Sequence, residues 1–156
     1  MKISDSLNIN NKLIRTRSFE MAGQFLRVRI PLVSEMDEIN ERVKNVEWES
    51  KFKKLAEPFL EQKETIETDD VSIKFIDDDI FVNDNSVKEM AKLTAQTHAR
   101  ILEMFKLLLP MDNEQDFSAL TYEEIEQEFP FSIQLEITKK ISEVISPGYE
   151  EIRKNL

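Results

Sequence analysis

The sequence predicts an α+β fold that is mainly helical, with a small antiparallel sheet packed on its helices. Apolar residues recur at steps of three and four through residues 85–109, which is the pattern of one helix face. They alternate with polar residues near 25–33 and near 71–82, as in half-buried strands. The chain has 156 residues and only 2 glycines, which argues against a fold built of many tight turns. We expect a flexible N-terminal tail over 1–12 and a single globular domain over 13–156.

The first part of the domain is expected to form a strand or a hairpin. Residues 13–21 alternate loosely, residues 25–33 alternate clearly, and residues 22–24 offer a turn between them. Pro31 indicates that the second arm is an edge strand or that its pairing stops there. The alternative for part of this segment is a short helix over 18–26.

Two helices are expected to follow. Ser34 is a suitable N-cap because acidic residues occupy the next turn, where they interact favourably with the positive end of a helix. The apolar stripe changes phase near residues 45–49, which predicts a break and a second helix turned relative to the first. The charged residues 61–70 are then expected to form a loop or a frayed helix end.

A second hairpin and the long helix occupy the middle of the chain. The hairpin is expected over 71–82, with its turn at the aspartates of residues 77–78, because Asp tolerates turn conformations. The long helix begins with a natural N-cap pair at residues 85–86 and is expected to continue to Leu109, before Pro110.

The C-terminal part is expected to be helical after an irregular, acidic segment over 111–120. Thr121 and Glu124 have the spacing of a capping box, which starts a short helix that should stop before Pro130. Residues 131–145 then place apolar side chains on one face of a further helix.

Charge and cysteine content limit the partners. Cysteine is absent, which excludes disulfides, thiolate zinc sites and cysteine nucleophiles. Residues 1–34 hold six basic and two acidic residues, so they carry +4 and the remainder of this −10 chain carries −14. Binding to nucleic acid is not expected, because the acidic body repels phosphates. No apolar run is long enough for a membrane helix, so no membrane partner is expected.

Few residues have the pattern of a catalytic or metal site. His98 is the only histidine and lies on or near the apolar face of the long helix, so a core or interface residue is favoured over a general base. The aspartates at 77–79 and Asp84 lack the glycine and closing glutamate of a calcium loop, so solvated turn acids are favoured. We expect no enzymatic activity, no cofactor and no metal site.

The segment 112–128 combines acidic and aromatic residues and contains no Lys or Arg. Such a surface suits a basic or amphipathic helical protein partner. The alternative is an ordinary short helix whose apolar side closes the core. We favour that alternative for the aromatic residues, whereas the acids fit a partner.

The end of the long helix is apolar nearly all round, so one face cannot bury all of it. The surplus, chiefly Met104 and Leu107, must be covered by the helix at 131–145, by another copy of the chain or by a client helix. Full burial of both side chains within one chain would exclude a client groove there. The candidate partner-binding residues are Met104, Leu107, Leu108, Phe117, Tyr122, Glu123 and Glu126.

Two stretches of the chain resemble tail assembly chaperones of long-tailed bacteriophages. The first is the segment 18–31, which ends in an apolar-Arg-Val-Arg-Ile-Pro strand, with the acidic helix start at 34–38. The second is the segment 120–130, together with Pro-Gly-Tyr at 147–149. The hairpin at 71–82 has no counterpart in that pattern.

The resemblance implies a non-enzymatic chaperone in the host cytoplasm. It would bind the helical tape measure protein, keep it soluble during tail morphogenesis and help to recruit tail tube subunits. Contact between the basic start and the acidic body would also allow a homo-oligomer. The alternative function is an acidic inhibitor or DNA mimic that blocks a nucleic-acid-binding protein. A small enzyme is the least favoured class.

Overall fold

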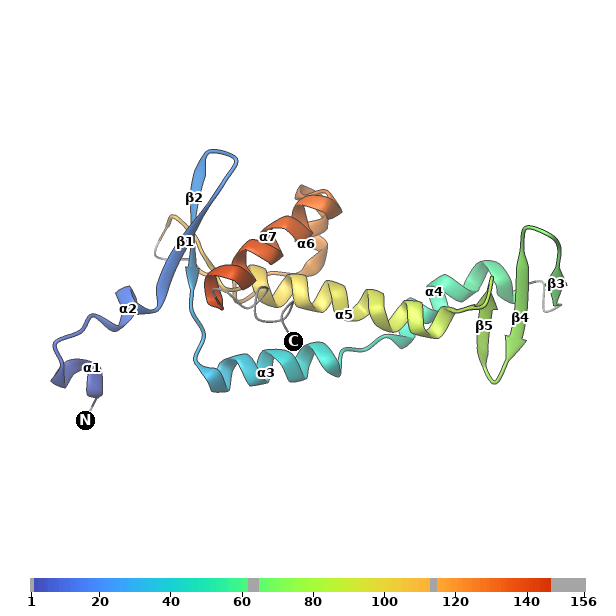
Figure 1. The fold of residues 1–156 in the computed structure, drawn as a ribbon, viewed down its shortest axis with the longest axis horizontal. Helices are drawn as coiled ribbons and strands as arrows, with labels where there is room; N and C mark the ends of the chain where they lie inside the picture. Colours follow the sequence, from blue (N-terminus) through green and yellow to red (C-terminus); the bar gives the residue numbers. More distant parts are fainter. Residues whose placement is uncertain (1, 62–64, 113–114, 147–156) are drawn as a thin grey trace, which may run out of the picture. The chain divides into compact units, whose positions relative to one another are not determined.

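The computed structural model describes residues 2–61, 65–112 and 115–146. It confirms the α+β class, since the chain is mainly helical and has two small antiparallel sheets packed with helices (Figure 1). The chain forms two compact units. Unit 1 comprises Met1–Asn40 and Arg100–Leu156, and unit 2 comprises Glu41–Ala99.

The limits of the two units fall inside helices α3 (Val33–Lys44) and α5 (Val87–Phe105). Domain boundaries are usually visible in a sequence as linkers rich in Gly, Pro or polar residues, and a continuous helix carries no such signal. The sequence predicts one globular domain over 13–156, whereas the structure forms two compact units, each with its own core.

The N-terminal segment contains two single-turn helices, α1 (Ile3–Ser6) and α2 (Asn11–Ile14). Neither of them buries a side chain. Asn10 caps α2, because its side chain accepts hydrogen bonds from the backbone N–H groups of the next turn. The flexibility of residues 1–12 stays a prediction.

Unit 1 contains a sheet of order β1-β2-β7, formed by β1 (Thr16–Met21), β2 (Gln24–Arg29) and β7 (Leu108–Leu109). The N-terminal hairpin is confirmed, and the alternative helix over 18–26 is wrong. Ala22 and Gly23 both have positive φ (52° and 77°), which is the backbone of a two-residue turn that matches strand twist.

The long helix is shorter than expected. α5 ends at Phe105, and the backbone carbonyl of Leu107 accepts a hydrogen bond from the N–H of Arg29 (2.9 Å). Leu108 and Leu109 then pair with β2. The residue before a proline is driven toward extended backbone, so Leu109 joins a strand more readily than it continues a helix.

The core of unit 1 brings β2, α3, α5, α6 (Tyr122–Glu128) and α7 (Phe131–Ile145) together. The capping box of α6 is confirmed, because the Thr121 side chain accepts from the N–H of Glu124 and the Glu124 carboxylate accepts from that of Thr121. The buried apolar residues are Val28, Ile39, Ile101, Met104, Phe105, Leu107, Ile125, Ile137 and Ile141.

Gln134 lies in this core although it is polar, with 1% of its surface exposed. Its side chain accepts a hydrogen bond from the Tyr122 hydroxyl (2.9 Å) and donates one to the Phe129 carbonyl (2.8 Å). A buried amide is tolerated when both its donor and acceptor groups are satisfied. These bonds join α6 to α7.

The start of α3 differs from the expectation. The helix begins at Val33, and Ser34 lies inside it. The backbone N–H of Met36 donates to the Leu32 carbonyl (2.9 Å), so Leu32 occupies the capping position. Glu35 reaches back to the Leu32 N–H (3.5 Å) as the glutamate of a capping box does, which explains why the serine is not needed as the cap.

Unit 2 contains α4 (Glu49–Leu60) and a sheet of order β3-β4-β5-β6. The predicted helix break before α4 is confirmed, as is the hairpin of β4 (Ser72–Ile76) and β5 (Asp79–Val82). Its turn is made by two aspartates with positive φ, in keeping with the tolerance of Asp for that conformation. The core of unit 2 comprises Ala56, Ile73, Ile80 and Val87.

Two short strands of this sheet were not predicted. β3 (Ile66–Glu67) lies in the segment expected to be a loop, and β6 (Asn85–Ser86) lies in the expected N-cap. Two residues are too few to produce an alternating pattern. Ser86 still caps the start of α5, because its Oγ accepts a hydrogen bond from the N–H of Glu89 (3.1 Å).

We predict that Ile141→Ala lowers the free energy of unfolding by about 2–5 kcal/mol, because it opens a cavity in a core that cannot fully collapse. Ile141 has 0% of its surface exposed, so the variant loses the full burial free energy of the removed side-chain atoms. Lys139→Ala, an exposed change on the same helix, is the matched control and should stay within about 0.5 kcal/mol. Urea unfolding monitored by circular dichroism measures both. Equal stabilities of the two variants would contradict the described core.

Candidate functional site

The two residues expected to form a client groove are buried. Met104 and Leu107 are each 2% exposed and belong to the core of unit 1. Ser142 of α7 lies with its Oγ 3.9 Å from the Met104 sulfur, so α7 covers this side chain. The prediction of a client groove at the end of α5 is therefore wrong. The sequence showed that the apolar surplus must be covered, but not which element covers it.

The other candidates divide between the core and the surface. Leu108 is half-buried in β7, and Phe117 and Tyr122 are half-buried as well. Burial raises the pKa of the Tyr122 hydroxyl, and the negative charge of Glu126 adds to the effect. Glu123 and Glu126 are exposed on α6. Tyr122 thus packs against the core of unit 1, Phe117 is half-buried, and the acids lie on the surface.

Two exposed apolar side chains on the helix that follows these acids in sequence were missed. Phe131 and Leu135 are 50% and 43% exposed and lie one turn apart on the same side of α7. The sequence pattern directed attention to the isoleucine stripe of this helix, which is the buried side. We call Glu123, Glu126, Glu128, Phe131 and Leu135 the α6–α7 surface.

Unit 2 has an apolar groove of its own between α4, α5 and the sheet. Its volume is about 250 Å³ and no charged side chain lines it; the lining residues are Leu55, Phe59, Val82, Asn83, Asn85, Val87 and Met90. Nearby, two α5 lysines lie over aromatic rings. Lys88 Nζ is 5.8 Å from the Phe52 ring centre and Lys92 Nζ is 4.8 Å from that of Trp48, within cation–π range. We call these seven lining residues the α4–α5 groove.

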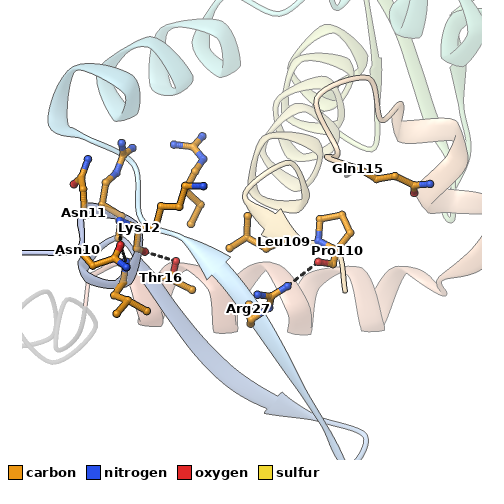
Figure 2. A pocket seen from close by; sticks show the side chains of 11 residues that line it. Asn10, Asn11, Lys12, Thr16, Arg27, Leu109, Pro110 and Gln115 are labelled. Atoms are coloured by element: carbon orange, nitrogen blue, oxygen red, sulfur yellow. Dashed lines mark hydrogen bonds between the residues drawn. The ribbon is translucent and has the colours of Figure 1, made fainter. Parts of the chain in front are cut away.

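Unit 1 contains a pocket with a basic lining. It has a volume of about 690 Å³ and is shown in Figure 2. The N-terminal side chains lie on one side of it, and residues around Pro110 lie on the other. The residues that line this basic pocket are Asn10, Asn11, Lys12, Leu13, Arg15, Thr16, Arg27, Arg29, Leu109, Pro110 and Gln115.

One carboxylate organises two of the four basic side chains of the pocket. Glu35 forms ion pairs with Arg15 (2.7 Å) and with Arg29 (2.6 Å), one at each carboxylate oxygen. Arg27 donates instead to the Pro110 carbonyl (2.8 Å), as the dashed line in Figure 2 shows. Among the described residues, no carboxylate pairs with Arg27 or Lys12. One carboxylate thus serves two of the four lining cations, and the other two have no ion pair within the described residues.

The sequence contained a signal for this pocket. The +4 charge of residues 1–34 marks the segment as basic, but charge alone does not show which of its side chains converge. The convergence of Arg27 with Leu109 and Pro110 depends on the pairing of β2 with β7, which joins residues more than eighty positions apart. Two-residue strands give no sequence pattern from which that pairing follows.

The described residues offer little for catalysis or membranes. They contain no group of three His, Cys, Asp or Glu residues arranged to hold a metal ion. His98 is half-buried on α5, in keeping with the favoured interpretation of a core or interface residue. In the part of the chain that the structure describes, no helix combines the length and apolar character needed to span a membrane.

Comparison with protein-family models gave no match, and neither the curated proteins nor the solved structures contain a significant match to this chain. The functional assignment therefore rests on the residues and surfaces described above.

We predict that Glu35 stabilises the fold in a pH-dependent way. Hydrogen bonding to Arg29, followed by Arg15, holds the pKa of Glu35 below its usual value of 4.5, although partial burial opposes the shift. A carboxylate with a lowered folded-state pKa contributes stability above its unfolded pKa, and that contribution is lost as the pH falls toward the folded pKa. Wild type should thus be more stable than Glu35→Gln at neutral pH.

This difference should shrink as the pH falls from above 4.5 through that value. Urea unfolding of both proteins over a series of pH values measures it. A difference that does not vary with pH would show that the charge of Glu35 contributes nothing to the stability of the pocket wall.

Proposed function

We propose that the protein is a non-enzymatic tail assembly chaperone of a long-tailed bacteriophage. In this role it binds the tape measure protein in the host cytoplasm and keeps it soluble while the tail is built. The resemblance of residues 18–38 and 120–130 to such chaperones motivates the proposal. Recruitment of tail tube subunits and formation of a homo-oligomer are further parts of the same proposal.

The observation that carries the proposal is the α6–α7 surface. It places two large exposed apolar side chains on a helix that directly follows an acidic one. α6 contains four glutamates and no basic residue. An amphipathic helix is recognised by apolar contacts at turn spacing and by charges that complement its flanks. A helical client with basic flanks fits these features.

The α4–α5 groove supports the same function in unit 2. Its lining residues Met90 of α5 and Leu55 of α4 are 48% and 38% exposed. Exposed apolar side chains that gather at one place can mark a contact with a partner, whereas single ones are normal. A chaperone needs apolar contact surfaces that are small enough for release of the client, and charged surroundings that keep the free protein in solution.

Co-expression with a tape measure protein tests the proposal. Alone, the tape measure protein is expected to be insoluble; with the chaperone it should remain in solution and co-elute with it. Loss of co-elution, with the client insoluble in both cases, would refute the proposed function.

We predict that the double variant Phe131→Ala, Leu135→Ala lowers the yield of the soluble complex several-fold, because it removes both apolar contacts of the α6–α7 surface. Phe25→Ala is the matched control. Phe25 is 73% exposed on β2, outside this surface, and its loss should leave the yield unchanged. Equal losses in the two variants would mean that general apolar exposure, and not this surface, holds the client.

The acidic-inhibitor hypothesis makes a different prediction. It requires that the exposed glutamates of α6 act as phosphate mimics toward a nucleic-acid-binding protein. Charge-neutral variants at Glu123 and Glu126 would then abolish binding, whereas Phe131→Ala would not. A chaperone should show the opposite order, because apolar burial supplies most of the binding free energy.

A further inference from the structure

We infer that the basic pocket of unit 1 binds an acidic segment of a protein partner, in which carboxylates are interspersed with apolar side chains. This is a second recognition site, and its charge preference is opposite to that of the α6–α7 surface. It does not depend on the chaperone function proposed above.

The charges of the pocket favour an anionic ligand. Four cations line one pocket in a chain whose net charge is −10, and Lys12 and Arg27 have no ion pair among the described residues. Like charges gathered at one place repel each other, and a bound anion relieves that repulsion. Lys12 is exposed and Arg27 is half-buried, so both reach solvent from the pocket wall.

The arrangement of Arg15 and Arg29 favours a ligand that carries carboxylates. Glu35 holds Arg15 and Arg29 side by side before any ligand arrives. A guanidinium has five N–H donors in a fixed plane, and each of these ion pairs uses one terminal nitrogen. Arg15 also donates its Nε–H to the Ile30 carbonyl (3.2 Å). Donors that are held in place cost less entropy when they bind a carboxylate.

The apolar part of the lining identifies the class of ligand. Leu13, Leu109 and Pro110 line the pocket together with the basic residues. Leu13 is 71% exposed, so it can be covered by a ligand. A free phosphate or sulfate would leave these side chains in water, whereas a peptide with Leu or Phe between its acids would cover them.

Nucleic acid fits the site less well. Phosphate backbones need basic residues along a continuous path. The pocket has only four lining cations, and the chain beyond residue 34 carries −14. A short acidic peptide can match these four cations, whereas a long polyanion would extend along an acidic chain that repels it.

Fluorescence anisotropy tests the inference on the full chain. The probe is a short fluorescein-labelled peptide with Asp and Glu interspersed with Leu and Phe. The control probe has every Asp replaced by Asn and every Glu by Gln. The acidic probe should bind saturably and lose affinity as salt is added, and the neutral probe should not bind. Equal binding of the two probes, or of neither, would overturn the inference.

Two variants place the binding in the pocket. Lys12→Gln changes an exposed side chain, so it tests the site without a risk to the fold. The double variant Lys12→Gln, Arg27→Gln should bind the acidic probe roughly ten-fold or more weakly, since charge-assisted hydrogen bonds are lost. Lys139→Gln, an exposed cation on α7, is the matched control and should bind as the wild type does. Unchanged affinity of both pocket variants would overturn the assignment.

Competing occupants give distinct results. Single-stranded DNA or inorganic phosphate that displaces the acidic probe at lower concentration than the unlabelled peptide would overturn the peptide assignment. A dimer that depends on Lys12 and excludes the probe would identify a second copy of the chain as the occupant, and would also overturn it. Displacement by the unlabelled acidic peptide alone supports the inference.

Discussion

The burial of the apolar end of α5 is the constraint on which unit 1 depends. From Ile101 to Leu107 five of the seven side chains are apolar, and four of these five are at most 4% exposed. A helix end of this kind must be covered on several sides, because exposed apolar area is costly in water. α6 and α7 pack against this end of α5, and β2 pairs with the backbone of the residues that follow the helix. The following residues then form β7 and the wall of the basic pocket.

This constraint also limits which apolar side chains are left for contact with a partner. Because Met104 and Leu107 are used by the core, the surfaces left for a partner are those that the core does not need. On α7 these are Phe131 and Leu135, which lie outside the buried isoleucine stripe. On α6 they are the glutamates. The basic pocket, which Leu109 of β7 lines, has the opposite charge. The chain therefore offers two chemically different surfaces within one unit, one acidic and apolar, the other basic and apolar.

The sequence predicted most of the elements and part of the site. Strong local signals succeeded: the capping box at Thr121, the turn at Gly23, and the phase change before α4 are each encoded within a few residues. The two-residue strands β3, β6 and β7 were not predicted, since they form only by pairing with a neighbouring strand and have no sequence pattern of their own. The limits of the two units were invisible for the related reason that they fall inside helices.

The errors at the site have the same origin. A helical period says which residues share a face but not which neighbour covers that face. The sequence therefore left α7, another copy and a client open as the cover of Met104, and its choice as a partner-binding residue was wrong because α7 covers it. Glu123 and Glu126 were placed correctly on the surface because acids without a partner are rarely buried. The basic pocket required the pairing of Arg27 with Leu109, which is a tertiary fact.

Hydroxyl-radical footprinting with mass spectrometry tests the central claim most directly, because it reads side-chain exposure in the free protein and in its complex. The account predicts that Phe131 and Leu135 are oxidised in the free chain, and that the tape measure protein protects both while Phe25 stays reactive. Met104 should react slowly throughout, although methionine is intrinsically easy to oxidise. Rapid oxidation of Met104 in the free chain that is suppressed by the client would contradict the account, since it would place the client at the end of α5 after all.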